Sequence, residues 1–520
     1  MIKRPGGTNM RAFRWGNGVR RAASLCLACL CLLLAAPGRA EQEEDVTARV
    51  LGYFQELAAI PRTSGHEEAV GDYLMAWAKG QGFAPTRDRA GNVIFDVPAA
   101  SGYENAPRTV LQGHMDMVAV SDDPAFDPLT DPVTPVRAGD TLTGKGTSLG
   151  ADNGAGLAVI MTYVSSDAPH GPLRVIVTVE EENDLSGVKS LDPALVKDAA
   201  YLFNLDNEAE GSACVSTAGH VVLTVSGKAR MAEPTLERAL RIRIDGLSGG
   251  HSGLKINAGK LNAIVTLSET LLTLGQNGVA YELASLRGRG VHNAIPGEAE
   301  AVITVSAADA EKAADIVREK AEGLRKTYAA TDGDMALTAA PTALPEAVFA
   351  PELACRIVDF AALVPNGVNT MSQRVAGLVE SSSNLGAAQA DADGIAFTTC
   401  VRSSEQALME SVLLRETRLA ALCGFTTGIA YGSDAWPVDA DAKLPALLSE
   451  VYKEQTGKDL IIESVHAGLE CGTFARMNEE IDMVCIGAQI DGAHTTKETL
   501  RISSVGTLYH LLAETLKRLK

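Results

Sequence analysis

Three apolar segments of this 520-residue chain run directly into acidic or imidazole side chains, and this arrangement restricts the possible folds. The segments are residues 108–113, 173–179 and 200–204. The first leads into His114 and Asp116, the second into acids and amides at residues 180–184, and the third into Asp206. Apolar runs bounded by polar clusters are typical of buried strands. Because strand ends meet along one edge of an open α/β sheet, the pattern predicts a site at that edge.

His114 and Asp116 are spaced so that they can act together at the end of their strand. Residues i and i+2 of a strand point to the same face, so Asp116 can hydrogen-bond the His114 nitrogen that does not bind metal. Such a carboxylate fixes the tautomer of a metal-binding histidine. A simpler alternative is a pair of polar side chains that face water. Asp152, which precedes the apolar run 157–164, has a similar alternative as a helix N-cap.

The combination of these residues favours a hydrolytic site with two metal ions. Imidazoles at His114 and His494 and carboxylates at Asp152, Asp206 and residues 180–182 can hold two zinc ions when one carboxylate bridges them. A shared water or hydroxide between the ions has a lowered pKa. A neighbouring glutamate that does not bind metal can take its proton, which is what hydrolysis requires.

Six segments resemble, in the same order, the motifs of the aminoacylhistidine dipeptidases. They are QGHMDMV (112–118), GTSLGADNG (146–154), TVEEE (178–182), NLDNE (204–208), HAGLECG (466–472) and IGAQIDGAH (486–494). This family is the carnosine-cleaving branch of the di-zinc aminoacylase and carboxypeptidase-G-like metallopeptidases. The resemblance covers the chain after about residue 45.

The resemblance implies a role for each residue of the expected site. Its metal ligands would be His114, Asp152, Glu182, Asp206 and His494. Asp152 would bridge two Zn²⁺ ions, with Co²⁺ or Mn²⁺ as alternatives, and His114 and Glu182 would belong one to each ion. Asp116 would orient His114, and Glu181 would be the general base.

Further residues are implied in the middle of the chain. His251, in SGGHSG (248–253), would polarise the scissile carbonyl and stabilise the oxyanion. Asn293 and Arg402 would hold the carboxylate end of the substrate, a task that suits the bidentate guanidinium. The alternatives are a flexible turn around His251 and a surface cation at Arg402.

The chain departs from the family pattern at three places. Glu180 stands where relatives commonly have aspartate, which leaves the assignment of base and ligand among the three glutamates open by one residue. The segments 214–220 and 431–437 match the family only loosely. The resemblance therefore implies least about the preferred substrate side chain.

The order of the expected elements predicts an α/β protein with a mostly parallel catalytic sheet and an inserted α+β, ferredoxin-like lid domain. Strand-like and helix-like segments alternate up to about residue 210, whereas strands with one polar face follow between 217 and 430. The expected metal ligands lie on either side of that middle stretch. We therefore expect the catalytic domain at 41–216 and 431–520, and the lid at 217–430. Residues 64–67, Ser-Gly-His-Glu, resemble a capping box that starts a helix.

The first forty residues resemble a secretory signal peptide. They contain seven basic residues and no acid, an apolar run at 22–36 that is short for a membrane span, and small residues before Glu41. The sequence therefore predicts an exported protein, periplasmic or secreted, that has no membrane anchor once the signal is cleaved. An uncleaved anchor is the alternative.

The charge balance excludes some partners. The chain has 46 basic and 65 acidic residues, a formal net charge of −19. Such a surface disfavours nucleic acid and anionic membranes as partners. A small peptide substrate is expected, and the family resemblance also implies a homodimer formed through the inserted domain.

The expected function is hydrolysis of unblocked dipeptides, with Xaa-His (carnosine-like) substrates as one class, by a metal-bridging hydroxide and Glu181. Two alternatives with the same fold are an N-acyl amino acid deacylase and a tripeptide aminopeptidase. A third is a catalytically silent protein that binds peptide or metal. That protein would lack a ligand or the base, whereas every expected position is filled here.

Overall fold

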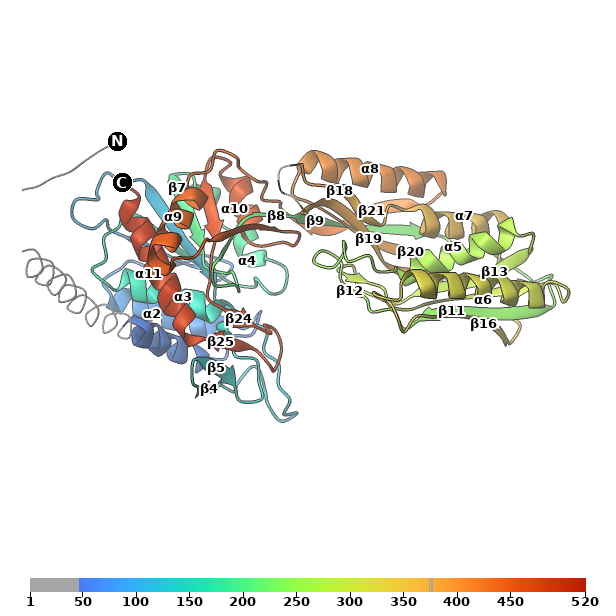
Figure 1. Cartoon of the computed structure of the whole chain (residues 1–520), viewed down its shortest axis with the longest axis horizontal. Coiled ribbons are helices and arrows are strands. Elements are labelled where there is room, and N and C mark those ends of the chain that lie inside the picture. The colour runs from blue at the N-terminus through green and yellow to red at the C-terminus, as the bar shows by residue number, and fades with distance from the viewer. Residues whose placement is uncertain (1–45, 374, 376) are drawn as a thin grey trace, which may run out of the picture.

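The computed structural model describes residues 46–373, residue 375 and residues 377–520, so the expected signal peptide at 1–40 lies outside the described residues. Two β-sheets organise the chain into two bodies that lie next to each other along the long axis of the molecule (Figure 1). The first body contains the C-terminus, and the second is built from the middle of the sequence. Within the described ranges, no helix is both long and apolar enough to cross a bilayer.

The first sheet has eight strands in the order β1-β2-β6-β3-β7-β23-β8-β22. Its central strands β6, β3, β7 and β23 pair in parallel, whereas β1–β2, β2–β6 and β23–β8 are antiparallel pairs. The parallel centre agrees with the predicted α/β class. The strands are β1 (Thr86–Arg87), β2 (Val93–Val97), β3 (Arg108–His114), β6 (Leu173–Thr178), β7 (Ala199–Asn204), β8 (Ser212–Thr217), β22 (Ile461–Val465) and β23 (Asp482–Cys485).

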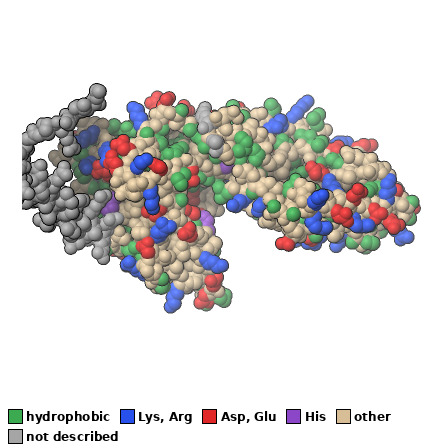
Figure 2. Space-filling model, in the orientation of Figure 1, with side chains coloured by type: hydrophobic (Ala, Val, Ile, Leu, Met, Phe, Trp, Pro, Cys, Tyr) green, Lys and Arg blue, Asp and Glu red, His purple; other side chains and the backbone are tan. Residues whose placement is uncertain are grey.

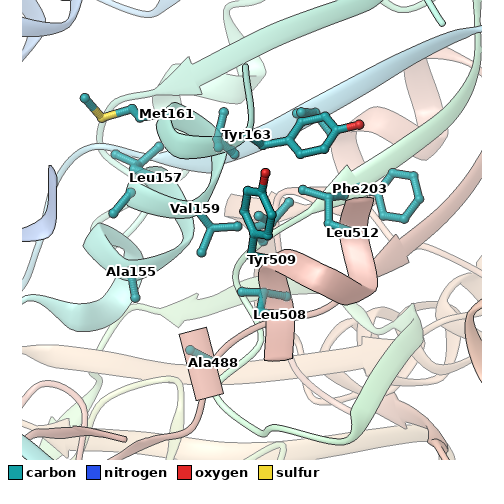
Figure 3. Close-up of a cluster of buried hydrophobic side chains, with 14 of the residues drawn as sticks. Ala155, Leu157, Val159, Met161, Tyr163, Phe203, Ala488, Leu508, Tyr509 and Leu512 are labelled. Atoms are coloured by element: carbon teal, nitrogen blue, oxygen red, sulfur yellow. The ribbon is translucent and has the colours of Figure 1, made fainter. Parts of the chain in front are cut away.

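Helices cover both faces of the first sheet. They include α3 (Ala151–Val164), α4 (Ser186–Lys189), α9 (Leu444–Thr456), α10 (Cys471–Met477) and α11 (Ile502–Arg518). Val110 of β3 contributes to the core shared with α4 and α10, and the next residue, Leu111, to the core shared with α3, α9 and α11. Figure 3 shows part of the latter, where Tyr163 of α3 meets Tyr509 of α11 edge to face with 5.9 Å between ring centroids. Burial on both faces explains why the central strands are continuously apolar.

The predicted capping box at residues 64–67 is wrong. The next helix, α2 (Glu68–Gly80), has no side-chain hydrogen bond at its N-cap. Instead, the Ser64 hydroxyl donates to Asp116 Oδ2 at 2.7 Å, and the Gly65 N–H donates to Glu67 Oε1. The Ser64 hydroxyl therefore bonds a residue distant in the sequence and does not cap the helix.

The second sheet is antiparallel and has nine strands. Eight follow the order β16-β11-β15-β13-β19-β20-β9-β21, and β18 pairs with β19. The strands are β9 (Gly219–Gly227), β11 (Arg238–Asp245), β13 (Tyr281–Gly288), β15 (Ala299–Val305), β16 (Ala336–Thr342), β18 (Gly367–Met371), β19 (Val379–Asp391), β20 (Gly394–Ser403) and β21 (Thr426–Ser433).

Part of the second sheet has the expected ferredoxin-like topology. The elements β11, α5 (Ala263–Gln276), β13, β15, α6 (Ala310–Thr327) and β16 follow one another, and their strands lie in the order β16-β11-β15-β13. Five more strands, with α7 (Pro351–Leu363) and α8 (Gln406–Leu422), extend this unit beyond the sequence prediction.

The second sheet packs against helices on one face only. On β11, Leu240 and Ile242 are buried in a core with α5, α6 and α7, whereas Arg241 and Arg243 between and after them are exposed. This alternation is the pattern of a half-exposed antiparallel sheet. The chain passes from β8 of the first sheet to β9 of the second at Ala218, and it returns after β21. The two sheets therefore meet at the ends of these strands.

Candidate metal centre

His114 and Asp116 stand at the carboxyl end of β3, as the sequence predicts. His114 Nδ1 lies 3.3 Å from Asp116 Oδ1, and both side chains are buried. Asp116 also accepts the backbone N–H groups of Glu181 and Glu182, at 3.1 and 3.2 Å. Its carboxylate thus fixes the imidazole and, at the same time, the loop that follows β6.

Asp152 lies between the two histidines. His114 Nε2 is 3.1 Å from Asp152 Oδ1 and 3.1 Å from Asp206 Oδ1. His494 Nε2 is 3.1 Å from Asp152 Oδ2 and 2.8 Å from Glu182 Oε1. Each oxygen of Asp152 therefore faces a different histidine, and the five predicted ligands form two groups that share one carboxylate.

These separations suit a pair of cations. In a tetrahedral site with metal–ligand bonds of about 2.0–2.1 Å, neighbouring ligand atoms are about 3.3 Å apart. The observed distances of 2.8–3.1 Å are close to that value. Imidazole nitrogens and carboxylate oxygens are also ligands that zinc prefers, so the donor set fits two divalent ions with Asp152 between them.

Asp152 owes its position to the fold around the start of α3. The backbone of Asp152 is not helical, with φ −80° and ψ 114°, and its side chain does not cap the helix. This geometry argues against the N-cap alternative. A small four-stranded sheet, in the order β24-β25-β5-β4, joins the segments that precede Asp152 and His494. Its strands are β4 (Pro135–Ala138), β5 (Thr141–Gly144), β24 (Ile490–Asp491) and β25 (Thr499–Arg501).

The three consecutive glutamates point in different directions. Glu180 has φ 53°, and its Oε2 accepts a hydrogen bond from the Asn183 side chain at 3.1 Å. Glu181 offers a carboxylate oxygen within 4.8 Å of ligand atoms of His114 and Asp206. Glu182 contacts His494, as described above. Glu181 and Glu182 thus face different parts of the centre, each within reach of a candidate metal group, and Glu180 lies outside both groups.

Negative charge dominates the centre. Burial opposes protonation of His114, yet the carboxylates of Asp206, Asp116 and Asp152 together raise its pKa well above the usual range. Hydrogen bonds to Asp152 and Glu182 raise the pKa of His494 to about 11. The carboxylates around both imidazoles therefore favour a positive charge at this place. A metal ion supplies that charge when it displaces the imidazole protons.

The carboxyl groups of Glu181 and Asp206 also respond to burial. Desolvation raises the pKa of each well above its ordinary value, because water cannot solvate the charged form of a buried carboxyl group. A raised pKa makes the Glu181 carboxylate a stronger proton acceptor.

Glu498 is a part of the centre that the sequence does not reveal. Its two carboxylate oxygens accept the backbone N–H groups of four consecutive residues, Leu149, Gly150, Ala151 and Asp152, at 2.7–3.3 Å. Glu498 is buried and follows His494 by four residues. It therefore holds the backbone of Asp152 to the loop that carries His494.

Arg62 is a second residue that sequence reasoning missed. Its fully buried guanidinium donates to the carbonyls of Met115 and Asp116 at 2.9 Å, and to that of Gly150. Burial lowers its pKa, and Glu498 is the strongest of the surrounding carboxylates that oppose this effect. No local pattern marks a single buried arginine, so only the tertiary structure shows that it joins the two loops.

Glu470 lies in the HAGLECG segment, to which the sequence assigned no role. Its Oε2 accepts hydrogen bonds from Gln112 Nε2 at 2.5 Å and Thr178 Oγ1 at 2.8 Å, and Glu470 is completely buried. Burial raises its pKa to about 7. Glu470 ties the turn after β22 to strands β3 and β6 beneath the centre.

The residues predicted in the middle of the chain form a separate group. His251 lies on β12 (Gly250–His251), and its Nδ1 accepts the N–H groups of Gly253 and Leu254. Arg402 is 4% exposed, and its side chain makes no hydrogen bond or ion pair with any described residue. The Asn293 carbonyl accepts the N–H of Ser252 at 2.8 Å, which holds Asn293 beside His251.

This second group meets the first body near His466. A Cβ atom at Gly253 would lie 2.2 Å from the His466 carbonyl oxygen and 3.3 Å from Arg402 Nε. Burial and Arg402 lower the pKa of His251 to about 4, so its imidazole is neutral. Among the described side chains, neither His251 nor Arg402 hydrogen-bonds a predicted metal ligand. The space-filling view shows a notch between the two bodies, with histidine side chains at its border (Figure 2).

Comparisons with known proteins agree with this architecture. The model of peptidase family M20/M25/M40 matches residues 110–518. The cytosol non-specific dipeptidase of Escherichia coli (strain K12) is 33% identical over 469 residues, which cover 90% of this chain and 96% of that protein. The crystal structure of aminoacylhistidine dipeptidase from Vibrio alginolyticus aligns with a TM-score of 0.84 and 31% identity over 91% of this chain and 97% of that chain. A tripeptidase from Staphylococcus aureus shares the fold, with a TM-score of 0.53, 16% identity, and coverage of 91% and 98%.

The resemblance inferred from the motifs is thereby confirmed for the family and for the overall structure. The family match spans most of the chain, and the structural match extends over both sheets. The chain belongs to peptidase family M20/M25/M40 and is a metal-dependent peptide hydrolase.

Proposed function

We propose that this hydrolase is a dipeptidase that cleaves unblocked dipeptides, with Xaa-His among its substrates. The observation that carries the proposal is Arg402 on β20, which is 4% exposed and whose Nε is buried without a protein partner. A buried cation without a partner requires an anion, and the free carboxylate of a short peptide provides one. The names of the Escherichia coli and Vibrio alginolyticus relatives support the same substrate class.

We assign the reaction to the residues of the two groups. His114, Asp152, Glu182, Asp206 and His494 would hold two divalent ions, which we propose to be zinc. When bound, the ions would supply a water of lowered pKa and polarise the scissile carbonyl. Glu181 would take the proton of that water and deliver it to the leaving amine. His251 would donate to the oxyanion once the two bodies close on the substrate.

A substrate panel tests this proposal. Purified protein with its metal content measured would be assayed on β-alanyl-histidine, leucyl-histidine, their N-acetyl forms and leucyl-glycyl-glycine. We expect rapid cleavage of the free dipeptides only. Preferential cleavage of the acetylated forms would favour a deacylase, preferential cleavage of the tripeptide would favour a tripeptide aminopeptidase, and no cleavage of any substrate by metal-loaded protein would favour a silent binding protein.

A matched pair of variants tests the role of Arg402. Arg402→Met should raise KM for dipeptides strongly because it removes the carboxylate partner. Arg415→Met, at an exposed position of α8, should behave as wild type because its guanidinium donates to Asn369 near the surface. An unchanged KM in Arg402→Met would contradict the assignment.

We also propose a homodimer formed through the second sheet. Strand β21 is an edge strand whose residues are mostly exposed, and Ile429 on it is 68% exposed. An unpaired, apolar edge is suited to pair with a second copy. Ile429→Asp should therefore shift the sedimentation coefficient from dimer to monomer. Ile461→Asp, at a 63% exposed position on edge strand β22 of the first sheet, is the control that should leave a dimer formed through the second sheet intact.

We propose that the protein is exported, on the basis of the basic and apolar segments before Glu41. Cell fractionation and N-terminal sequencing of the mature protein test this proposal. We expect extracytoplasmic protein that begins near residue 41. Cytoplasmic protein with an intact N-terminus would contradict it.

A further inference from the structure

Four imidazoles gather around Arg402 where the second sheet meets the first body. They are His220, His251, His292 and His466, which we call the imidazole cluster. His220 lies directly opposite Arg402 on the neighbouring strand, and the His220 and His292 rings stack with 6.1 Å between centroids and 15° between planes. His466 Nε2 bonds the Ser382 hydroxyl at 2.7 Å.

The sheet register places part of this group in one row. Ser382, Arg402, His220 and Ser433 lie opposite one another on β19, β20, β9 and β21. Residues directly opposite in neighbouring strands point to the same face. The adjacent residues Val401 and Val221 pack under α8 on the other face. The row therefore lies on the face that no helix covers.

Several nitrogen atoms of this group have no protein partner. Ser433 Oγ lies 2.7 Å from His220 Nδ1, which leaves His220 Nε2 without a hydrogen bond to a described residue. Tyr431 Oη lies 2.7 and 3.1 Å from the two ring nitrogens of His292, but one hydroxyl can satisfy only one of them. Arg402 Nε is buried and unpaired. The group thus has hydrogen-bonding capacity that the folded chain leaves unused.

The local charge is positive. Throughout the described chain, no carboxylate forms an ion pair with Arg402 or with an imidazole of the cluster. Burial and then Arg402 lower the pKa of His220 to about 3, and His292 and Lys189 add to this effect. His220 and His292 are therefore neutral N–H donors beside a guanidinium, in a protein whose net charge is strongly negative.

We propose that His220 and His292 recognise an acidic side chain on the C-terminal residue of the dipeptide, so that Xaa-Asp and Xaa-Glu are preferred substrates. This inference rests on the proposed function, in which Arg402 holds the terminal carboxylate. The Cβ atoms of Arg402 and His220, which lie opposite each other on paired strands, are about 5 Å apart, so the two side chains can contact two carboxylates of one residue. The second carboxylate would accept hydrogen bonds from the unpaired imidazole nitrogens, and such charge-assisted bonds are the strong ones.

Neutral isosteres give the sharpest test. The kcat/KM of the wild-type protein would be compared for Ala-Glu against Ala-Gln and for Ala-Asp against Ala-Asn. We expect a preference of about tenfold or more for the acid in each pair, because bonds to a charged group discriminate by at least that factor. Equal rates for acid and amide would overturn the inference, whereas failure to cleave any dipeptide would overturn the proposed function instead.

A double variant assigns the preference to the two rings. His220→Phe/His292→Phe keeps ring stacking but removes the nitrogens, so the acid-to-amide ratio should fall to about one. Hydrolysis of Ala-Leu by the double variant verifies that it is folded and active. His510→Phe, on α11 of the first body, is the matched control and should keep the wild-type ratio. A double variant that retains the full acid preference would show that other groups cause it.

Discussion

At the scale of single residues, the centre consists of side chains that each make more than one contact. Asp116 contacts His114 and the backbone of Glu181 and Glu182. Asp152 contacts both His114 and His494. The function of each residue therefore depends on where the others hold it. The predictions at this scale separate the residue that moves a proton from those that hold metal or backbone.

The three adjacent glutamates should differ sharply when each is changed to glutamine. Glu181→Gln should lower kcat by at least about 10²–10⁴-fold while two metal ions per chain remain bound, because only the base is lost. Glu182→Gln should lose metal, and Glu180→Gln should keep both activity and metal. Metal analysis and steady-state kinetics distinguish these outcomes, and an active Glu181→Gln variant would contradict the assignment of the base.

Glu498→Gln should weaken metal binding although Glu498 is not a ligand. A carboxamide presents only one acceptor oxygen to the four N–H groups that Glu498 now accepts, so Asp152 loses its fixed position. Loss of such supporting contacts typically costs about 10–100-fold in affinity. Competition with a chelator measures the Kd for Zn²⁺, with the surface variant Glu514→Gln as control. An unchanged Kd would exclude a positioning role.

At the scale of elements, strand order and burial follow from patterns that the sequence displays. The apolar segments before His114 and Glu180 are the central parallel strands, and alternating residues such as Leu240 and Ile242 mark a strand with one exposed face. The capping box was wrong because Ser64 bonds a residue 52 positions away. Local patterns predict elements well and tertiary partners poorly, since hydroxyls and carboxylates choose partners only after packing.

Helix α8 carries a buried carboxyl that should make stability depend on pH. Burial raises the pKa of Glu416 to about 7, while Ser383 and Thr399 donate hydrogen bonds to it. The folded state binds the proton of this carboxyl more tightly than the unfolded state, whose pKa is near 4.5. The resulting contribution to stability is complete below pH 4.5 and is lost as pH rises to about 7.

The change over that interval amounts to about 3 kcal/mol for this one group. Glu416→Gln removes the titration, so the difference in unfolding free energy between wild type and variant should change between pH 4.5 and 7 and remain constant above. Denaturant titrations at several pH values measure it. A difference that is independent of pH would contradict the raised pKa.

At the scale of the whole molecule, metal binding and folding should be coupled. The centre joins β3, the loop after β6, the start of α3 and the segment after β24, so the ions would connect loops from distant parts of the sequence. Removal of the ions with EDTA should abolish activity and lower Tm. At metal concentrations 100-fold above Kd, each site contributes about 2.7 kcal/mol to stability. Scanning calorimetry measures the shift, and Zn²⁺-saturated EDTA is the control that should have no effect.

Much of the centre could be predicted because its ligands follow strands in recognisable motifs. His114 and Asp206 follow apolar strands, and Asp152 and His494 lie in segments with distinctive glycine spacing. The resemblance of these motifs then supplied their roles. Arg62 and Glu498 could not be predicted, because an isolated charge in a sequence gives no sign of whether it will be buried or of what it will contact.

By itself the sequence determined the parallel catalytic sheet, since apolar runs and polar strand ends are local properties of the chain, and the resemblance of its motifs identified the family and the candidate metal ligands. Only the tertiary structure decided which glutamate faces His494, how Glu498 and Arg62 hold the loops, and that His220 and His292 stack beside Arg402. The physical reason is that these contacts join residues dozens to hundreds of positions apart. Their energies depend on burial and orientation, which exist only once the chain has folded.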